Sequence, residues 1–250
     1  MAVTLITGAS SGIGRALSLA LAARGDMIVA VARRKELLDT LVLEIESRGG
    51  RALAVQCDVT VPEQVRAARD AAVQTFGTLD RIIANAGGGE RNPAEQFSAQ
   101  AIADMFTLNV TSAAHCIETV LPDMLQRGSG HIVLMSSLAS RRGLPRATGY
   151  SGAKAAMTAL GEGLRTELKP RGIDVTVLMP GFVAAKPGRK PRPFEVPLET
   201  AAKQMAEAIL ARRKSYMFPW PLVLITAILR VLPAGVSDWI VQRVQGPRPT

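Results

Sequence analysis

The sequence predicts an α/β protein built around a doubly wound parallel sheet. Over the first 180 residues, short apolar or β-branched runs alternate with longer amphipathic stretches, as strands alternate with helices. The short runs are apolar along their whole length. This pattern is typical of strands covered by helices on both faces, as in a parallel sheet.

Each element is placed by its hydrophobic period and the turn residues that flank it. Six strands are expected, at Val3–Thr7, Met27–Ala32, Ala52–Cys57, Arg81–Ala84, His131–Ser136 and Asp174–Met179. Helices are expected near residues 13–24, 34–48, 62–76, 98–126 and 150–169. The four prolines, one glycine and four cations of the next stretch predict an irregular loop at residues 184–198. Residues 1–214 are expected to form a single domain, and residues 215–250 an apolar, basic and helical extension.

The composition excludes several classes of protein. The 250 residues are 48% hydrophobic and 20% charged, which is enough for one well-buried core. Cys57 and Cys116 are far apart in the chain, so neither a disulfide framework nor a four-cysteine zinc site can form, and a cytoplasmic location is expected. No basic leader precedes the first apolar run, which argues against a signal peptide.

The net charge of +9 is concentrated at one end of the chain. Residues 1–185 hold 19 Lys and Arg against 17 Asp and Glu, whereas residues 186–250 hold 11 against 4. Aromatic residues make up only 4% of the chain, so no stacking platform for nucleic-acid bases accompanies the cations. We therefore expect no nucleic-acid partner.

The first expected strand runs through a glycine-rich turn into a helix. The spacing of its glycines is Gly-x-x-x-Gly-x-Gly, which differs from the commoner Gly-x-Gly-x-x-Gly fingerprint. Such a turn lets a pyrophosphate approach the backbone, and the helix N-terminus offers it N–H donors. A turn that merely closes a strand–helix unit is the alternative. The residues expected to contact a dinucleotide here are Gly8, Ser10, Ser11, Gly12, Ile13 and Gly14.

The end of the second strand indicates which dinucleotide is bound. An NAD-binding protein would place an acid about 20 residues after the glycines, to hold the ribose hydroxyl. This chain has Ala32-Arg33-Arg34-Lys35 at that place. A guanidinium can bind a 2′-phosphate with paired hydrogen bonds, so we expect NADP rather than NAD, with Arg33 as the main contact. The alternative is that these cations only cap and solubilise the next helix.

Four polar residues form a candidate catalytic group. Tyr150 and Lys154 are four residues apart, which places both on one face of a helix. A neighbouring ammonium would stabilise the phenolate and so lower the tyrosine pKa. Ser137 follows an apolar strand and could donate a hydrogen bond to a developing alkoxide, and Asn109 is a polar side chain among apolar neighbours. The alternative makes Ser137 a helix cap and Asn109 a buried kink residue.

Asn109, Ser137, Tyr150 and Lys154, in this order and with the glycine spacing above, resemble the Asn-Ser-Tyr-Lys tetrad of the short-chain dehydrogenase/reductase family. The resemblance covers about residues 3–183 and implies a Rossmann-type fold, a nicotinamide cofactor and usually a homodimer or homotetramer. It implies that Tyr150 is the general acid/base and that Ser137 polarises the carbonyl. It also implies that Lys154 binds the nicotinamide ribose and that Asn109 holds a relay water.

The resemblance extends the expected cofactor site to further residues. The family uses an aspartate after the third strand for the adenine, an Asn-Ala-Gly motif after the fourth, and a Pro-Gly after the sixth. The residues that match are Asp58, Val59, Asn85, Ala86, Gly87, Pro180, Gly181 and Val183. One departure is that Ala185 stands where many relatives have a threonine that bonds the nicotinamide carboxamide. Either the backbone near Val183 suffices or the loop is ordered differently.

The function expected from these motifs is NADP-dependent hydride transfer between the nicotinamide and a carbonyl or secondary alcohol. A non-catalytic NADP(H) sensor on the same fold is the alternative. The sugar-nucleotide epimerase branch is disfavoured because 250 residues leave no room for its extra substrate domain. No Gly-x-Ser-x-Gly elbow is present for a hydrolase, and His115, Cys116 and His131 make no metal-ligand pattern, so no metal is expected.

The extension begins with an uncharged run from Tyr216 to Leu229, which is too short and too proline-rich at its start to span a bilayer. It is expected either to cover the substrate cleft or a subunit interface, or to lie on a membrane. In the second case residues 215–245 would make a peripheral contact with the inner face of a membrane, aided by Trp220, Trp239 and the cations around the run. Both readings favour an apolar or lipid-like substrate.

Overall fold

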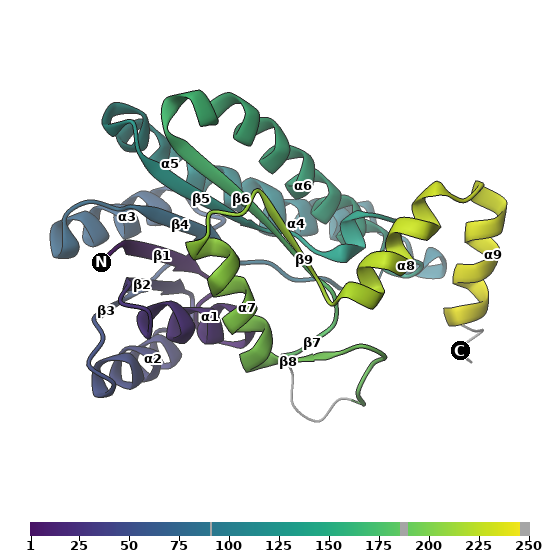
Figure 1. Ribbon diagram of the computed structural model, residues 1–250, viewed down its shortest axis with the longest axis horizontal. Coiled ribbons are helices and arrows are strands. Elements are labelled where there is room, and N and C mark those ends of the chain that lie inside the picture. The colour runs from purple at the N-terminus through teal and green to yellow at the C-terminus, as the bar shows by residue number, and fades with distance from the viewer. Residues whose placement is uncertain (91, 186–189, 246–250) are drawn as a thin grey trace.

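The computed structural model describes residues 1–90, 92–185 and 190–245 and contains the predicted parallel sheet (Figure 1). Seven strands lie in the order β3-β2-β1-β4-β5-β6-β9, and all neighbouring pairs are parallel. The strand order reverses between β1 and β4, where a doubly wound sheet forms its ligand crevice. The strands are β1 (Val3–Thr7), β2 (Met27–Ala32), β3 (Ala52–Gln56), β4 (Arg81–Ala84), β5 (Gly130–Met135), β6 (Ile173–Pro180) and β9 (Ser215–Phe218).

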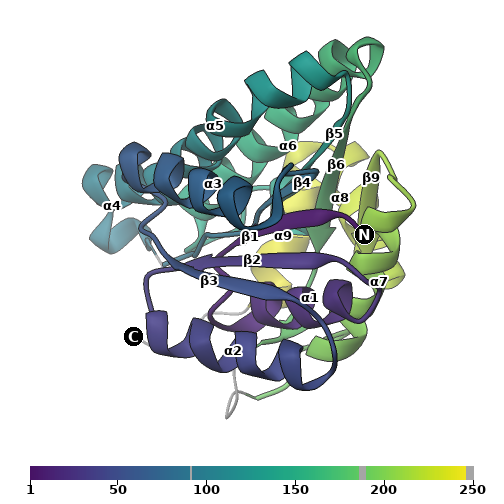
Figure 2. The same cartoon turned by 90° about the vertical axis from the view of Figure 1, so that its left-hand side faces the viewer.

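Helices cover both faces of the sheet, as Figure 2 shows. Buried side chains of α1, α2 and α7 pack on one face, and those of α3, α5 and α6 pack on the other. These two apolar layers explain why the strands are hydrophobic on both sides. The helices are α1 (Gly12–Ala22), α2 (Lys35–Ser47), α3 (Pro62–Phe76), α4 (Ala99–Phe106), α5 (Ser112–Arg127), α6 (Thr148–Leu168), α7 (Leu198–Leu210), α8 (Trp220–Val231) and α9 (Ala234–Gln245).

The six predicted strands are confirmed, and the sheet has a seventh that the sequence analysis missed. Strand β9 lies inside the segment assigned to the C-terminal extension and pairs with β6, from Val177–Ser215 to Pro180–Phe218. The expected boundary at residue 214 therefore falls before the last strand of the sheet. β9 has only four residues and sits at the sheet edge, so it is only partly buried and its sequence lacks the apolar signature of the inner strands.

Two other segments differ from expectation. The helix expected over residues 98–126 is two helices, α4 and α5, joined by a π-helical turn at Thr107–Thr111. The loop expected at residues 184–198 contributes to a short parallel ladder between β7 (Val183–Ala184) and β8 (Val196–Pro197), and α7 begins at its end.

The C-terminal helices α8 and α9 follow β9 and project beyond the end of the sheet (Figure 1). Leu222 and Val223 of α8 pack against Leu138, Val177 and Met179. No helix in the described ranges is both long and apolar enough to cross a bilayer.

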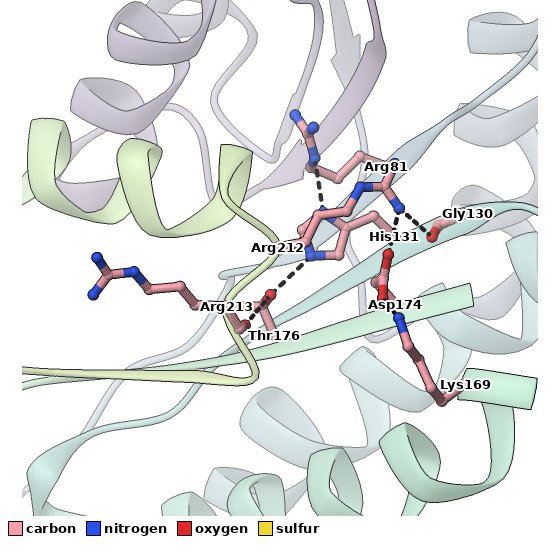
Figure 3. A network of polar contacts seen from close by, with 8 residues as sticks. All are labelled: Arg81, Gly130, His131, Lys169, Asp174, Thr176, Arg212 and Arg213. Atoms are coloured by element: carbon pink, nitrogen blue, oxygen red, sulfur yellow. Dashed lines mark hydrogen bonds and ion pairs between the residues drawn. The ribbon is translucent and has the colours of Figure 1, made fainter. Parts of the chain in front are cut away.

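A chain of buried polar groups crosses the amino ends of the strands, and Figure 3 shows its central part. Arg81 forms an ion pair with Asp26, and its Nε donates to Nδ1 of His131 over 3.2 Å. Since a guanidinium can only donate, Nδ1 accepts and the imidazole proton sits on Nε2. Nε2 then donates to the Thr176 hydroxyl over 2.8 Å, and Thr176 donates to the Arg213 carbonyl over 2.6 Å.

His131 is held neutral by this environment. Burial, followed by the charges of Arg81 and Arg212, lowers its pKa to about 3, and Asp174 opposes the shift only in part. Asp174 in turn accepts from Lys169 and Arg212, over 2.8 and 2.6 Å (Figure 3). His131 therefore has a role in the core, and the amino ends of the strands are tied to the turn before β9.

Candidate active site

The glycine-rich turn lies at the carboxyl end of β1, beside the end of β4. Gly8 and Gly12 have φ of +68° and +56°, values that favour glycine. Asn85 donates from Nδ2 to the Thr7 carbonyl over 2.8 Å, and the Thr7 hydroxyl accepts from the Ala86 N–H over 2.9 Å. These bonds hold the Asn-Ala-Gly segment against the turn.

The turn has the shape of a phosphate cradle. A Cβ at Gly14 would collide with the Gly8 carbonyl oxygen, so only glycine lets the start of α1 approach β1 this closely. Ser11, which precedes α1, makes no capping hydrogen bond with its side chain. The first N–H groups of α1, including that of Ile13, therefore have no side-chain cap from Ser11, and a helix N-terminus of this kind suits a pyrophosphate.

Arg34, which the sequence analysis did not select, contacts this turn directly. Its Nη2 donates to the hydroxyls of Ser10 and Ser11 over 2.9 and 2.7 Å. Arg33, the residue expected to be the main contact, is exposed and lines a cavity of about 430 Å³ between the ends of β2 and β3. The two adjacent cations thus reach different places, Arg34 the glycine-rich turn and Arg33 the cavity beside the end of β3. Sequence alone could not assign these directions, because they depend on the backbone after β2.

Asp58 and Val59 follow β3 beside this cavity. Asp58 lines it, and Oδ1 of Asp58 accepts from the Thr60 N–H and hydroxyl, which holds the pKa of the carboxyl below its usual range. The Val59 side chain is buried in the core, so only its backbone is left to face a ligand.

Tyr150 and Lys154 lie in the first two turns of α6, as the spacing predicts. Lys154 is 4% exposed, and its Nζ lies 5.7 Å from the centroid of the Tyr150 ring and donates to the Met135 carbonyl over 2.8 Å. Ser137 follows β5, and its hydroxyl donates to the Pro180 carbonyl over 3.3 Å and accepts from the Ala139 N–H. Ser137 therefore caps the short helix Leu138–Ser140, as the alternative expected. Its hydroxyl also lies within hydrogen-bonding reach of Tyr150.

The pKa values of the pair are set mainly by burial. Burial lowers the pKa of Lys154 to about 8. Burial raises the pKa of Tyr150 above its ordinary value, and the hydrogen bond with Ser137 opposes this only in part. The net shift of the Tyr150 pKa is therefore upward, and the lowering expected from Lys154 is not seen. The phenol is protonated at neutral pH.

Asn109 is aimed into the same region by the π-helical turn. Its Nδ2 donates to the carbonyls of Gly88 and Met105, each over 2.9 Å, while its buried Oδ1 has no partner in the described structure. A Cβ at Gly87 would lie 2.5 Å from this Oδ1 and 3.3 Å from Lys154 Nζ. Gly87 thus leaves room beside an unpaired acceptor and an ammonium.

The segment after β6 closes the site. The Gly181 N–H donates to the Phe218 carbonyl, and a Cβ at Gly181 would meet Leu222 of α8 at 2.9 Å. Val183 is half-buried against the core. The Ala185 side chain lies near Gly12, so the residue that departs from the family pattern is beside the glycine-rich turn.

The structure therefore assembles the predicted tetrad and cofactor residues at the carboxyl edge of the sheet. His115, Cys116 and His131 are not part of this site, and no group of three His, Cys, Asp or Glu in the described ranges could hold a metal. Besides Arg34, sequence analysis missed Gly89, where a Cβ would clash with the Tyr150 ring, and Leu222. Neither residue has a sequence signal, because each acts by packing.

The fold and the residues gathered at the carboxyl ends of its strands define a nicotinamide-dependent oxidoreductase of the Rossmann class. The family described as short chain dehydrogenase matches residues 2–194, and the chain belongs to this family. An oxidoreductase from Myxococcus xanthus (strain DK1622) is 36% identical over an aligned length of 244 residues, and the alignment covers 96% of each chain. The 3-oxoacyl-[acyl-carrier-protein] reductase FabG of Staphylococcus aureus (strain N315) is 35% identical over 72% of this chain and 74% of its own.

Solved structures of other dehydrogenases have a similar fold. A short-chain dehydrogenase from Streptomyces avermitilis has a TM-score of 0.81 at 28% identity and covers 98% of both chains. An alcohol dehydrogenase from Thermococcus sibiricus, complexed with 5-hydroxy-NADP, has a TM-score of 0.79 at 27% identity, over 87% of this chain and 96% of its own. A 7α-hydroxysteroid dehydrogenase complexed with NADH has a TM-score of 0.80 at 26% identity, over 87% and 92%. The family uses NAD(P)(H), and these neighbours include both forms.

Proposed function

We propose that the protein is an NADPH-dependent reductase of an apolar carbonyl compound. The observation that carries this proposal is the convergence of Tyr150, Ser137, Lys154 and the unpaired Oδ1 of Asn109 beside Gly87. The cradle of the glycine-rich turn fits a dinucleotide pyrophosphate, and the nicotinamide group would supply the hydride.

The chain's own residues would supply the proton and the geometry. Tyr150, protonated at neutral pH, would donate its proton to the carbonyl oxygen as the hydride adds to the carbon, which gives an alcohol. Ser137 would hold the same oxygen with its hydroxyl. Lys154 would bind the nicotinamide ribose, and Oδ1 of Asn109 would accept from a water that returns a proton to Tyr150. A raised Tyr150 pKa suits this reducing direction, because the acid form predominates.

The preference for NADP rests on charge at the end of β2. No carboxylate stands in Ala32-Arg33-Arg34-Lys35, Arg34 contacts the glycine-rich turn, and Arg33 lines the cavity beside the end of β3. The remaining proposed cofactor contacts are Gly8, Ser10, Ser11, Gly12, Ile13, Gly14, Asp58, Val59, Asn85, Ala86, Gly87, Pro180, Gly181 and Val183.

An apolar substrate is supported by the walls of the site. Leu222 and Val223 of α8 pack on Leu138, the residue after Ser137. A second cavity of about 470 Å³ lies beside the start of α6 and has a mixed lining, with Phe97 and Pro145 next to Asn92, Glu95 and Arg146. Of the proteins named above, one is a 3-oxoacyl-[acyl-carrier-protein] reductase, and the 7α-hydroxysteroid dehydrogenase is complexed with 7-oxo glycochenodeoxycholic acid. We place the enzyme in the cytoplasm, since Cys57 and Cys116 are free thiols, and propose a homodimer or homotetramer through the helices that carry Asn109 and Tyr150.

The decisive experiment follows NADPH oxidation over a panel of aliphatic, acyl and steroid ketones. Tyr150→Phe is expected to abolish turnover while NADPH binding stays nearly unchanged, because the phenol is needed only for proton transfer. Lys154→Met is expected to damage both. A wild-type protein that binds NADPH but turns over no substrate would instead support the sensor alternative, and a Tyr150→Phe variant with more than a few per cent of activity would place the proton donor elsewhere.

A further inference from the structure

Helix α8 has a second apolar face that points away from the protein. Leu222 and Val223 form the inner face against Leu138. The outer face carries a stripe of Trp220, Leu224, Ile228 and Val231, all exposed, with Trp220 75% exposed. Spacings of four, four and three residues place these side chains in one row along the helix. We call this row, together with the neighbouring exposed Ile225, the outer stripe.

Helix α9, which follows α8, also exposes apolar side chains. Val236 and Trp239 are exposed, whereas Ser237 and Val241 are buried. An ion pair between Asp238 and Arg142 ties α9 to the loop after β5. The chain has only two tryptophans, and both are exposed on these two helices. Tryptophan combines an apolar ring with a polar N–H and is enriched where a membrane meets water.

The charge beside this surface is positive. Arg230 and Arg243 are exposed, and neither forms an ion pair with a residue in the described ranges. The Arg243 guanidinium lies 4.6 Å from the centroid of the Trp239 ring. Asp238 is the only acid between residues 208 and 250, and Arg142 already neutralises it. Arg212, Arg213 and Lys214 do not add to this charge, because they lie before β9, at the end of the strand away from α8.

We propose that α8 and α9 dock on the surface of an anionic lipid bilayer. The outer stripe and Trp239 would enter the headgroup level, and Arg230 and Arg243 would contact lipid phosphates. The 12 residues of α8 give a helix of about 18 Å, which suits lying along the surface. A second copy docked through the same face would instead bring two sets of uncompensated arginines together, with no free carboxylate to meet them.

The first experiment uses the full chain with phosphatidylcholine vesicles that contain or lack phosphatidylglycerol. We expect flotation with the anionic vesicles at low salt, reduced at high salt, and a blue shift of tryptophan emission that reports on these two helices alone. Absence of both flotation and the emission shift with anionic vesicles would overturn the proposal. So would a wild-type dimer that fails to float and becomes monomeric when the outer stripe is changed, because the face would then join two copies.

Matched variants separate the outer stripe from general hydrophobicity. Leu224→Ser with Ile228→Ser is expected to weaken vesicle binding at least roughly tenfold, since both side chains would leave the lipid. Leu43→Ser, at a 65% exposed leucine on α2, is the control and should bind as the wild type does. Arg230→Gln is expected to weaken binding roughly fivefold and Lys203→Gln, an equal charge change on α7, not at all. Equal losses of vesicle binding in variant and control would contradict the proposal. The proposal is independent of the proposed reaction, since flotation needs no substrate.

Discussion

Some side chains of the candidate active site have room only because the residues beside them are glycines. Gly87 leaves room for the unpaired Oδ1 of Asn109 and for Lys154 Nζ, and Gly89 leaves room for the Tyr150 ring. The geometry of the candidate site therefore depends on the absence of a Cβ at these glycines as much as on the four side chains of the predicted tetrad.

Gly87→Ala tests this dependence. Its new Cβ would lie 2.5 Å from Asn109 Oδ1, so Asn109 or Lys154 must move. We expect kcat to fall roughly 10- to 100-fold, since small displacements of catalytic groups are costly. Gly88→Ala is the control, because its Cβ would meet only Leu108 at an ordinary 3.7 Å. Similar kcat values for the two variants would show that the space at Gly87 is not needed.

Cofactor choice is the second prediction at the residue scale. Arg33→Ala and Arg34→Ala are each expected to weaken NADPH binding by about 1.5–3 kcal/mol, the usual size of a hydrogen bond to a charged group, with little effect on NADH. Lys35→Ala, which removes the next cation, paired with Asp39, is the control. Titration of both cofactors by fluorescence measures the difference. If NADH binding falls as much as NADPH binding, the 2′-phosphate assignment fails.

Among the elements, helix α6 carries Tyr150 and Lys154 in its first turns and packs closely on the sheet further along. A Cβ at Gly161 would collide with Val177 and lie 3.1 Å from Leu134, whereas at Gly163 it would meet nothing within 4 Å. The sequence predicted this helix and the place of Tyr150 and Lys154 in its first turns, and the catalytic role of the pair stays a prediction. It could not show which of two glycines, only two residues apart, touches the sheet.

This difference gives a stability prediction with a control on the same helix. Gly161→Ala should lower the free energy of unfolding by about 1–3 kcal/mol, because the helix must shift from β6. Gly163→Ala should raise it by up to about 1 kcal/mol, because alanine favours the helix. Urea unfolding measures both changes. The opposite order would mean that α6 does not approach β6 as closely as described.

The parts of the fold that sequence did not predict share one property. β9 is short and lies at the edge of the sheet, and the π-helical turn around Asn109 changes only how a continuous helical pattern is wound. Neither alters hydrophobic periodicity over a long enough window to be seen. Residues with a fixed spacing, such as Gly8, Gly12 and Tyr150, were by contrast predicted, because the chemistry constrains them locally.

At the scale of the whole molecule, the two ends of the strands have different roles. The carboxyl ends hold the candidate active site, and the amino ends hold the polar chain from Arg81 through His131 to Arg213. His131 keeps the order of these bonds only while it is neutral.

Stability is therefore expected to depend on pH through His131. Its pKa is about 3 in the folded protein, against about 6.5 for an unperturbed histidine, so the unfolded chain binds a proton first as pH falls. The contribution of neutral His131 is complete above about pH 6.5 and is lost as pH falls from there toward 3, by at most about 1.4 kcal/mol per pH unit.

Urea unfolding at pH 7.5 and pH 5 measures this loss. His131→Gln, whose amide can accept from Arg81 and donate to Thr176, should reduce the loss of stability between the two pH values by about 2 kcal/mol. His115→Gln, which changes the other histidine, is the control. If both variants lose stability with falling pH as the wild type does, His131 does not set the acid limit of the fold.

The same polar chain has a consequence for how the molecule opens. The Thr176 hydroxyl has an acceptor for its proton only while the Arg213 carbonyl is in place. His131 Nε2 has an acceptor only while the Thr176 oxygen points toward it. Release of the turn before β9 would leave the buried Thr176 hydroxyl without its acceptor and would remove the contact that orients its oxygen toward His131 Nε2, at a cost that one edge strand alone would not have. The amides of β9, although at the sheet edge, should therefore exchange with deuterium as slowly as those of β6, since both open in one cooperative event.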